Sequence, residues 1–444
     1  AILLVSGAWA GAAAWSSHQV GNLLHQAAEN GWPDSNIKVR NLNHHAGWFH
    51  SEGDVELALV DKCNSTQKIT WVQVHYDMAH LLLPTSMMQF QWTLQPTGDD
   101  KASFEEIFQG TVALNGSGHM RFDQSFDTDI HLPSLSSNAV GRHMQLTPTS
   151  GFIRWGGDKL NLAISTDQIT VRGQRQAVNI QQLQFHIDLD SQQQGTGTSA
   201  ISFAKIDSDD LSLEGLKLAS TTLRQNGRFD MHLAFTLNKA SYQKHQLAEL
   251  KLAYELSGLH ADSVSQLIAL SGASCGFQNL TRDEHQQTRV ALKTLLTQGF
   301  KMGLSNLSAK LEGGQLQAQF MLDIAKSDSD AVQLSQYLKA QGHLSVDSHM
   351  LNSEQQQSLL DAGFTKPSAN ELKASLNYAA QQLTLNDKPF NSPLVPMMLA
   401  ELDKALNAYL NQDQTNTKIL DTLLPVIPEA DMPSAEPPST TAER

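Results

Sequence analysis

The chain has 444 residues, of which 40% are hydrophobic and 17% are charged, and its formal net charge at pH 7 is −14. This length predicts two or more domains, and the recurrence of apolar positions along the chain argues against disorder. The negative charge argues against nucleic acid as a partner, because nucleic acid is held mainly by Lys and Arg side chains that neutralise phosphates. It gives no attraction to anionic lipid surfaces either.

The first residues are the most apolar segment of the chain. Almost every residue of Ala1–Trp15 is apolar, small or aromatic, and none is charged. We expect the second half of a membrane anchor whose start precedes Ala1, because a full span needs about 20 apolar residues. Trp9 and Trp15 would suit the membrane interface. Small-x-small triplets at 8–10 and 12–14 leave cleavage as a signal peptide open as the alternative.

Short alternating segments dominate the chain from Ile37 onwards. Apolar and polar residues alternate in segments such as 69–76 and 157–164, and Gly, Asn or Asp separates one segment from the next. This pattern is typical of half-buried strands in an antiparallel meander, a sandwich or an extended curved sheet. Helices between strands are not indicated before Asp262, so we expect a mainly β (α+β) fold rather than βαβ units. An elongated sheet with one apolar face would form a groove.

A few helices are expected to pack on this sheet. They are indicated by capping residues at their starts, by apolar stripes at helical spacing and by glycines at their ends. The expected helices are Ser16–Asn30, Asp262–Leu270, Asp283–Phe300, Ser353–Ala362 and Ser392–Asn411.

The composition changes along the chain and suggests a domain boundary. All seven tryptophans lie at or before Trp155, and the Gln-rich stretch Ser191–Ser199 is the expected linker or long hairpin loop. The tail is rich in Pro, Glu, Ser and Thr and is expected to be disordered. The predicted units are a membrane anchor at 1–16, a β-rich domain at 17–190, a second β-rich domain with helices at 200–412, and the tail at 413–444.

The chain has two cysteines, Cys63 and Cys275. In an oxidising compartment they could form a disulfide that closes a loop of about 210 residues, which the chain-entropy model values at roughly 5 kcal/mol. Two unpaired thiols are the alternative, and the sequence leaves both open.

Several segments, taken in order, resemble a known bacterial family. Residues 7–11 (GAWAG) lie in the apolar segment, residues 43–51 (NHHAGWFHS) precede an alternating strand, and residues 376–378 (LNY) and 383–390 (LTLNDKPF) come near the end. In order and spacing over most of the chain, this resembles the YdgA-like family of Gram-negative envelope proteins, to which no function is assigned. The resemblance implies a single-pass inner-membrane anchor and a periplasmic body.

The chain departs from that family's pattern at two positions. Ala46 stands where a basic residue is usual, and Asp387 replaces a turn glycine. An Asn-Asp pair at 386–387 still suits a type I′ turn, in which both central residues have positive φ.

One short segment matches the residue pattern of a known catalytic motif. Residues 272–276 (GASCG) match G-x-S-x-G, in which Ser274 would be a nucleophile on a sharp turn between a strand and a helix. Residues 267–270 could be that strand, but residues 277–280 leave no room for the helix. A turn of small residues is therefore the favoured interpretation, and a serine hydrolase is kept as a remote alternative.

Histidines gather near the start of the strand region. His44, His45 and His50 lie close to Glu52 and Asp54, and imidazole with carboxylate can hold zinc. True zinc sites have tighter and more regular spacing, so a turn with surface histidines is favoured.

Two further groups of residues give still weaker indications of a functional site. His75, Asp77 and His80 flank a strand end and are expected to form a hairpin edge, with a functional role as the alternative. The acidic residues within 207–210 are expected to form a solvated turn, because the glycine and terminal glutamate of an EF-hand loop are missing.

No catalytic, cofactor-binding or metal-binding residue is therefore assigned, and the chain is expected not to be an enzyme. Nucleotide-binding glycine motifs and C-x-x-C are absent from the sequence. The apolar segments Leu81–Met88 and Pro393–Leu410 would suit lipid chains or partner helices, with ordinary core packing as the alternative. The sequence predicts an envelope protein that binds lipid or a hydrophobic segment along a sheet groove. The alternative is an assembly factor for another envelope protein, which could also self-associate into a homo-oligomer.

Overall fold

The computed structural model describes residues 37–59, 71–80, 86–97, 114–137 and 143–411, apart from short gaps at 174–175, 193, 244, 312–313 and 391–393, together with isolated residues such as Cys63. The expected anchor at 1–16, nearly all of the expected helix at 16–30 and the tail at 413–444 lie outside the described residues. Within the described part, no helix is long and apolar enough to cross a membrane.

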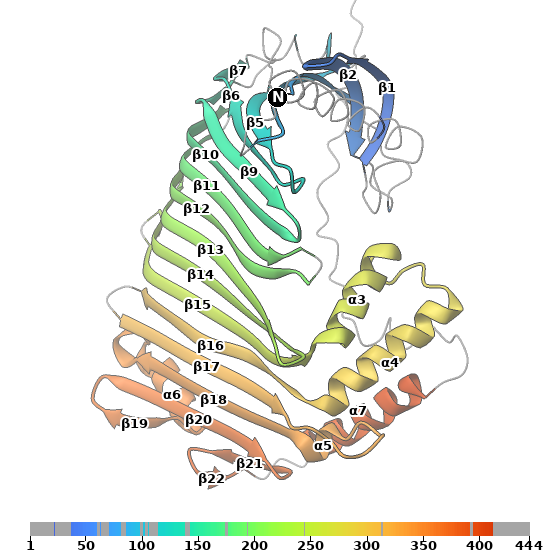
Figure 1. Ribbon diagram of the computed structural model, residues 1–444. Coiled ribbons are helices and arrows are strands. Elements are labelled where there is room, and N and C mark those ends of the chain that lie inside the picture. The colour runs from blue at the N-terminus through green and yellow to red at the C-terminus, as the bar shows by residue number, and fades with distance from the viewer. Residues whose placement is uncertain are drawn as a thin grey trace, which may run out of the picture.

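One antiparallel sheet of 22 strands makes up most of the molecule and curls into an open arch (Figure 1). Its first half comprises β1 Ile37–Ala46, β2 His50–Leu59, β3 Trp71–Ala79, β4 Met88–Pro96, β5 Leu114–Met120, β6 Phe126–Leu132, β7 Leu135–Ser137, β8 His143–Leu146, β9 Thr149–Gly156, β10 Lys159–Arg172 and β11 Ala177–Ser191. Its second half comprises β12 Thr196–Ser208, β13 Leu211–Gln225, β14 Arg228–Tyr242, β15 His245–His260, β16 Phe300–Leu311, β17 Gly314–Ile324, β18 Leu338–Asp347, β19 Thr365–Ser368, β20 Glu371–Ala379, β21 Gln382–Leu385 and β22 Lys388–Pro389.

The strands follow one another as a meander. Each strand from β1 to β6 pairs with the next, β6 then pairs with β9, and the series continues strand by strand to β18 and β20. The prediction of a mainly β, antiparallel fold is confirmed. At the expected linker, β11 and β12 pair directly with each other. The division of the chain into two domains stays a prediction.

The strands from β10 to β16 present apolar residues to one side of the sheet and polar residues to the other. Directly opposed residues of antiparallel neighbours point to the same face. One row across the sheet contains Ile164, Phe185, Ile201, Leu218, Phe235, Leu252 and Leu307. The adjacent row, on the opposite face, contains Ser165, Gln184, Ser202, Lys217, Thr236, Lys251 and Ser308. The alternation seen in the sequence therefore produces two chemically distinct faces.

The alternation is not strict along the long strands. Gln182 in β11, Gly215 in β13 and Glu249 in β15 have φ angles of 50°, 65° and 51°. Apolar residues are two positions apart on either side of Gln182, but Ile180 and Leu183 are three positions apart across it. Gln182, whose φ is positive, occupies the extra position. The apolar side chains before and after it therefore stay on the same face of the sheet, and the strand bends at this point.

Five helices complete the described fold: α3 Ala261–Ala273, α4 Arg282–Gln298, α5 Leu334–Tyr337, α6 Ser353–Asp361 and α7 Leu394–Leu410, besides the 3-10 turn η1 Ser348–Met350. The four helices expected in the second half of the chain are thus confirmed, with ends shifted by a few residues. Helix α4 begins at a capping box, in which Thr281 N donates to Glu284 Oε2 at 2.7 Å and Glu284 N donates to Thr281 Oγ1 at 3.3 Å. The Asn386–Asp387 turn has positive φ at both residues, as a type I′ turn requires.

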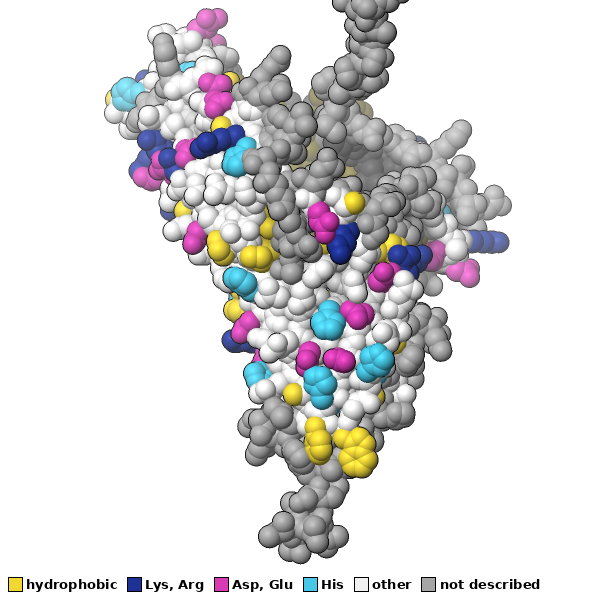
Figure 2. Space-filling model, turned by 90° about the horizontal axis from the view of Figure 1, so that it is seen from above, with side chains coloured by type: hydrophobic (Ala, Val, Ile, Leu, Met, Phe, Trp, Pro, Cys, Tyr) yellow, Lys and Arg dark blue, Asp and Glu magenta, His cyan; other side chains and the backbone are white. Residues whose placement is uncertain are grey.

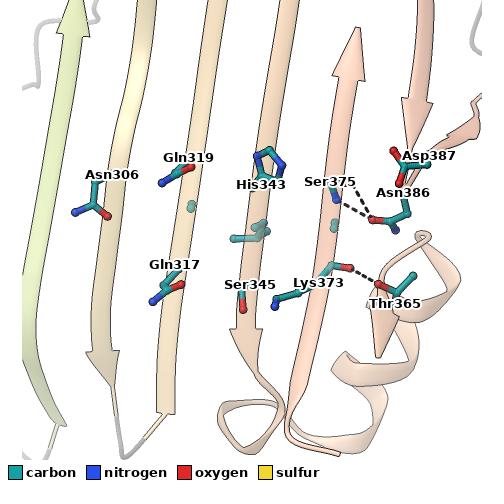
Figure 3. A pocket seen from close by; sticks show the side chains of 13 residues that line it. Asn306, Gln317, Gln319, His343, Ser345, Thr365, Lys373, Ser375, Asn386 and Asp387 are labelled. Carbon is teal, nitrogen blue, oxygen red and sulfur yellow. Dashed lines mark hydrogen bonds between the residues drawn. The ribbon is translucent and has the colours of Figure 1, made fainter. Parts of the chain in front are cut away.

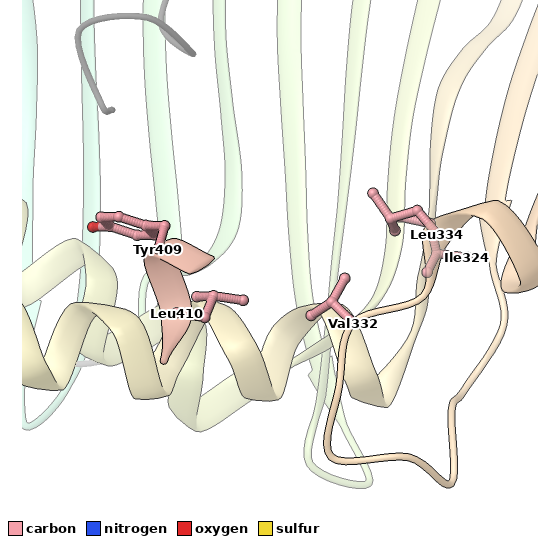
Figure 4. Packing of buried hydrophobic residues seen from close by; sticks show 5 residues of the cluster. All are labelled: Ile324, Val332, Leu334, Tyr409 and Leu410. Carbon is pink, nitrogen blue, oxygen red and sulfur yellow. The ribbon is translucent and has the colours of Figure 1, made fainter. Parts of the chain in front are cut away.

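The buried core lies where helices meet the sheet. One cluster joins α7 to the segment between β17 and β18 (Figure 4) and contains Ile324, Val332, Leu334, Tyr409 and Leu410. Hydrogen bonds reinforce it, because Asn407 Oδ1 accepts from Val332 N at 3.0 Å and Asn407 Nδ2 donates to Val332 O at 2.6 Å. A second cluster, Phe229, Leu259 and Ala261, anchors the start of α3. Between Leu146 and Phe229, no hydrophobic residue of the described part is buried.

Candidate functional site

The inner face of the arch carries apolar side chains that remain exposed. In Figure 1, α3, α4 and α7 lie on the inner side of the sheet, and the α3 cluster packs against Met231 and Leu256, which belong to the apolar rows. The apolar face is therefore the inner one. Within its rows, Leu218 is 47% exposed, Leu252 is 36% exposed and Phe320 is 42% exposed. We call this surface, from β9 to β17, the inner apolar face.

The outer face is polar and carries cross-strand charge pairs. Lys310 Nζ lies 2.6 Å from Glu249 Oε1, and Lys301 Nζ lies 3.3 Å from Asp323 Oδ2. Seen from above, histidine and acidic side chains gather on the surface with few hydrophobic ones between them (Figure 2). Water solvates this face, so it needs no ligand to explain its composition.

A half-open polar cleft of about 680 Å³ lies on the outer face across β16, β17, β18 and β20. Side chains from these strands line it, and the Asn386 turn and Thr365 of β19 form one edge (Figure 3). Asn386 Oδ1 accepts from Ser375 N at 2.8 Å, and Thr365 Oγ1 donates to Lys373 O at 3.2 Å. The labelled strand residues of the lining are Asn306, Gln317, Gln319, His343, Ser345, Lys373 and Ser375. These groups can hydrogen-bond a polar molecule, and Ser345 Oγ already donates to Glu371 Oε1 at 2.8 Å.

Ser274 of the G-x-S-x-G match is a helix-capping residue. The segment before it is not a strand, since residues 267–270 belong to α3. Its side chain is buried, its Oγ donates to Leu270 O at 2.6 Å, and Phe277 N donates to that Oγ at 3.2 Å. The hydroxyl thus closes the C-terminal end of α3 and does not sit on a turn that leads from a strand into a helix.

The N-terminal histidines do not converge. His44 faces the apolar side, where its Nδ1 lies 2.9 Å from the Tyr76 hydroxyl. His50 faces the polar side, with its Nδ1 3.4 Å from Asp77 Oδ1. The two histidines thus lie on opposite faces of the sheet, and a turn separates β1 from β2. In the part of the chain that the structure describes, no three side chains of the types that bind metals form a group.

His75 and His80 also have opposite environments. His75 Nδ1 lies 3.1 Å from Asp54 Oδ1 on the outer face. His80 is completely buried, and its Nε2 lies 2.8 Å from Ser51 Oγ. Sequence reasoning missed this pair, although His80 continues the inward series of Tyr76 and Met78 at a spacing of two. Ser51 joins it only through the pairing of β2 with β3.

The acidic turn and the apolar segments have ordinary structural contacts. Asp207 Oδ1 accepts from Ser212 Oγ at 2.6 Å, which lowers the pKa of Asp207. From the segment Leu81–Met88 the structure describes 86–88, and Met88 is buried. From the segment Pro393–Leu410 it describes α7, whose Met397 and Met398 are exposed while its C-terminal end is buried.

The chain was compared with known proteins at the level of families, curated sequences and solved structures. Residues 1–393 match the family model described as "Bacterial protein of unknown function (DUF945)". The chain belongs to this family. No curated protein and no solved structure matches it. The description of the DUF945 family names no activity, substrate or partner. The resemblance to a bacterial family is thus confirmed, and the YdgA-like name stays a prediction.

Proposed function

We propose that this DUF945 protein is a non-enzymatic envelope protein that binds lipid acyl chains on its inner apolar face. The observation that carries the proposal is the exposed apolar row across the middle strands, where Leu218 and Leu252 retain about half to a third of their surface in contact with solvent. Soluble monomers rarely leave large continuous apolar surfaces uncovered unless those surfaces bind something.

The chemistry of the face favours acyl chains over a peptide strand. Its inward side chains in the central row are Ile, Leu and Phe, which offer no hydrogen bonds. A peptide would bring backbone N–H and C=O groups that must find partners, and leaving them unpaired in an apolar site is costly. An acyl chain has no such groups. Covering about 300 Å² of apolar surface would contribute roughly 7 kcal/mol before the costs of ordering the ligand.

The disulfide supports an envelope location for the protein. Cys63 and Cys275 are joined, with their Cα atoms 5.3 Å apart. Disulfides persist mainly in oxidising compartments such as the bacterial periplasm and are rare in the cytosol. A periplasmic body on a single N-terminal inner-membrane anchor agrees with this and remains part of the proposal.

The proposal is tested by purifying the full-length protein from membranes in mild detergent and identifying bound lipids by mass spectrometry. The test variant combines Leu218→Gln with Leu252→Gln on the inner face. The control variant combines Lys217→Gln with Lys251→Gln, whose side chains belong to the adjacent outward row of the same strands. We expect stoichiometric phospholipid on the wild type and on the control, and a loss of most of it from the test variant.

Equal lipid content in all three proteins, or none in the wild type, would contradict the proposal. Thermal unfolding of each variant shows whether it is folded. Because Leu218 and Leu252 are partly exposed, their replacement should leave the melting temperature nearly unchanged.

A second candidate function is assembly with another envelope protein or with a second copy of the chain. It is favoured by exposed apolar residues at the start of α7, where Leu394, Met397 and Met398 are each more than half exposed. Methionine-rich surfaces adapt their shape to partners. A single protein that co-purifies at a fixed ratio and is lost from a Met397→Gln, Met398→Gln variant would favour this function over lipid binding.

A further inference from the structure

The disulfide joins the first strands of the sheet to the helical corner that follows β15, partway along the order of strands. Cys63 lies between β2 and β3, and Cys275 follows α3 directly, 212 residues later in the chain. In Figure 1, the β1–β2 end of the sheet and the corner between α3 and α4 face each other across the open side of the arch. The bond therefore spans the opening.

Helix α3 connects the sheet to this bond. We call it the strut, because it is fixed at both of its ends. Its base is fixed, because Ala261 is fully buried and packs with Phe229 and Leu259 at the ends of β14 and β15. Its tip is fixed by local hydrogen bonds, since Ser274 N donates to Leu270 O at 3.0 Å and Gly276 N donates to Ser271 O at 2.9 Å. Cys275 is thus held at a defined place beside the C-terminal end of α3.

The chain between the two cysteines forms a covalent ring that encloses the part of the inner apolar face from β9 to β15. It contains every strand from β3 to β15 and then α3, so that backbone pairing, the strut and the disulfide close the circle. The exposed side chains of Leu218 and Leu252 belong to strands of this ring.

We propose that the Cys63–Cys275 disulfide is a clasp that holds the arch closed and controls exchange of the apolar ligand. The clasp's control of exchange rests on the proposed lipid-binding function, whereas its effect on shape does not. With the bond intact, a bound chain leaves only through the ends of the ring. When the bond is reduced, the open side of the arch widens and the chain can also leave sideways.

The opening reaction is thiol–disulfide exchange. A dithiol reductant supplies two electrons and two protons, the bond between the two sulfur atoms breaks, Cys63 and Cys275 become thiols, and the reductant leaves as its own disulfide. A small disulfide oxidant reverses the reaction: it takes up the two electrons and two protons and leaves as two thiols.

Two measurements on the purified protein test the clasp. The first is the release rate of a phospholipid with a fluorescent acyl chain into an excess of unlabelled phosphatidylcholine vesicles. The second is the radius of gyration from small-angle X-ray scattering, which needs no ligand. Both are made on the oxidised protein, on the dithiol-treated protein and on the Cys63→Ser and Cys275→Ser variants.

We expect reduction and each serine variant to speed release about tenfold, because changes in affinity appear mainly in the dissociation rate. The radius of gyration should rise in the same samples. The dithiol should have no further effect on Cys63→Ser, which controls for other actions of the reductant. Circular dichroism identifies any variant that fails to fold, and the reduced wild type then provides the test.

The outcomes separate the clasp from the proposed function. Lipid that binds and leaves at the same rate from oxidised and reduced protein overturns the clasp and leaves lipid binding in place. If no lipid binds to the oxidised or the reduced protein, the proposed function fails. The X-ray scattering result is then the only test of the clasp. A larger radius of gyration on reduction then supports it, and an unchanged one overturns it.

Discussion

Ser51 and His80 form a hydrogen-bonded pair that is completely closed off from solvent, with Ser51 Oγ 2.8 Å from His80 Nε2. Ser51 lies at the start of β2, and His80 directly follows the end of the neighbouring strand β3. Both are next to the Phe49 turn, where Phe49 O accepts from His80 N at 2.8 Å. A buried imidazole avoids its charged form, so burial lowers the pKa of His80 below its ordinary 6.5, and the nearby His44 and His50 lower it further.

This pair predicts a loss of stability on mild acidification. The folded state resists protonation of His80, whereas the unfolded state takes up the proton near the ordinary value, so the unfolded state binds more protons as the pH falls below about 6.5. The free energy of unfolding should therefore decrease from that pH downwards and be fully retained above it. Urea unfolding between about pH 5 and 7.5 measures this change.

The variant His80→Gln isolates the contribution of this histidine. It keeps a hydrogen-bonding group for Ser51 but cannot titrate, so its stability should vary less with pH than that of the wild type. The control is His131→Gln, which changes an exposed histidine of the outer face. An equal pH dependence in the wild type and His80→Gln would show that His80 does not cause the acid sensitivity.

Gly215 is the residue of β13 with a left-handed backbone conformation. Its φ is +65°, and an added Cβ would collide with the side-chain amide of Asn238. We expect Gly215→Ala to lower the free energy of unfolding by about 1–3 kcal/mol. Gly227 is a matched control, since its φ is +71° but no atom lies within 4 Å of an added Cβ. Gly227→Ala should cost only the backbone strain of about 1 kcal/mol, and a cost as large as that of Gly215→Ala would argue against the collision.

The middle of the sheet is a single layer. Shortening a leucine there should therefore lower the free energy of unfolding less than shortening a leucine that is completely buried. Leu372 in β20 is completely buried, so Leu372→Ala should cost about 2–5 kcal/mol. Leu218 in β13 is 47% exposed, so Leu218→Ala should cost only about 0.5 kcal/mol in the absence of ligand. Denaturant unfolding of the two variants measures both costs. Comparable losses would mean that the inner face is covered in the free protein.

The attachment of α7 depends on Asn407, which satisfies both backbone groups of Val332. Asn407→Ala leaves these part-buried groups without their partner and should lower the free energy of unfolding by about 1–3 kcal/mol. Lys404→Ala on the same helix removes an exposed side chain and should change little. Limited proteolysis should then release α7 faster from the Asn407 variant than from the Lys404 variant, and identical rates would contradict this role.

Local patterns predicted the fold class and the four longer helices of the second half, but not the short helix α5. The alternation in β10 to β17 predicted strands because side chains of a strand point to opposite faces. The acidic start at Asp283 and the capping residue at Ser353 predicted two helix starts, and in the structure the caps lie slightly earlier, at Thr281 and Asn352. The Asn386–Asp387 turn was predictable for a similar reason, since both residues tolerate positive φ. All of these signals act over a few residues.

Relationships between distant residues were decided only by the tertiary structure. The sequence left the pairing of Cys63 with Cys275 open, because composition does not tell how far apart two cysteines lie in space. Ser274 matched a catalytic motif, but its helical surroundings made it a cap. Alternation predicted that each strand has an apolar side, yet only the joint curvature of the strands turns those sides inward and leaves Leu218 exposed there. Local backbone preferences determine the strands, whereas packing over the whole sheet determines which surface remains available to a ligand.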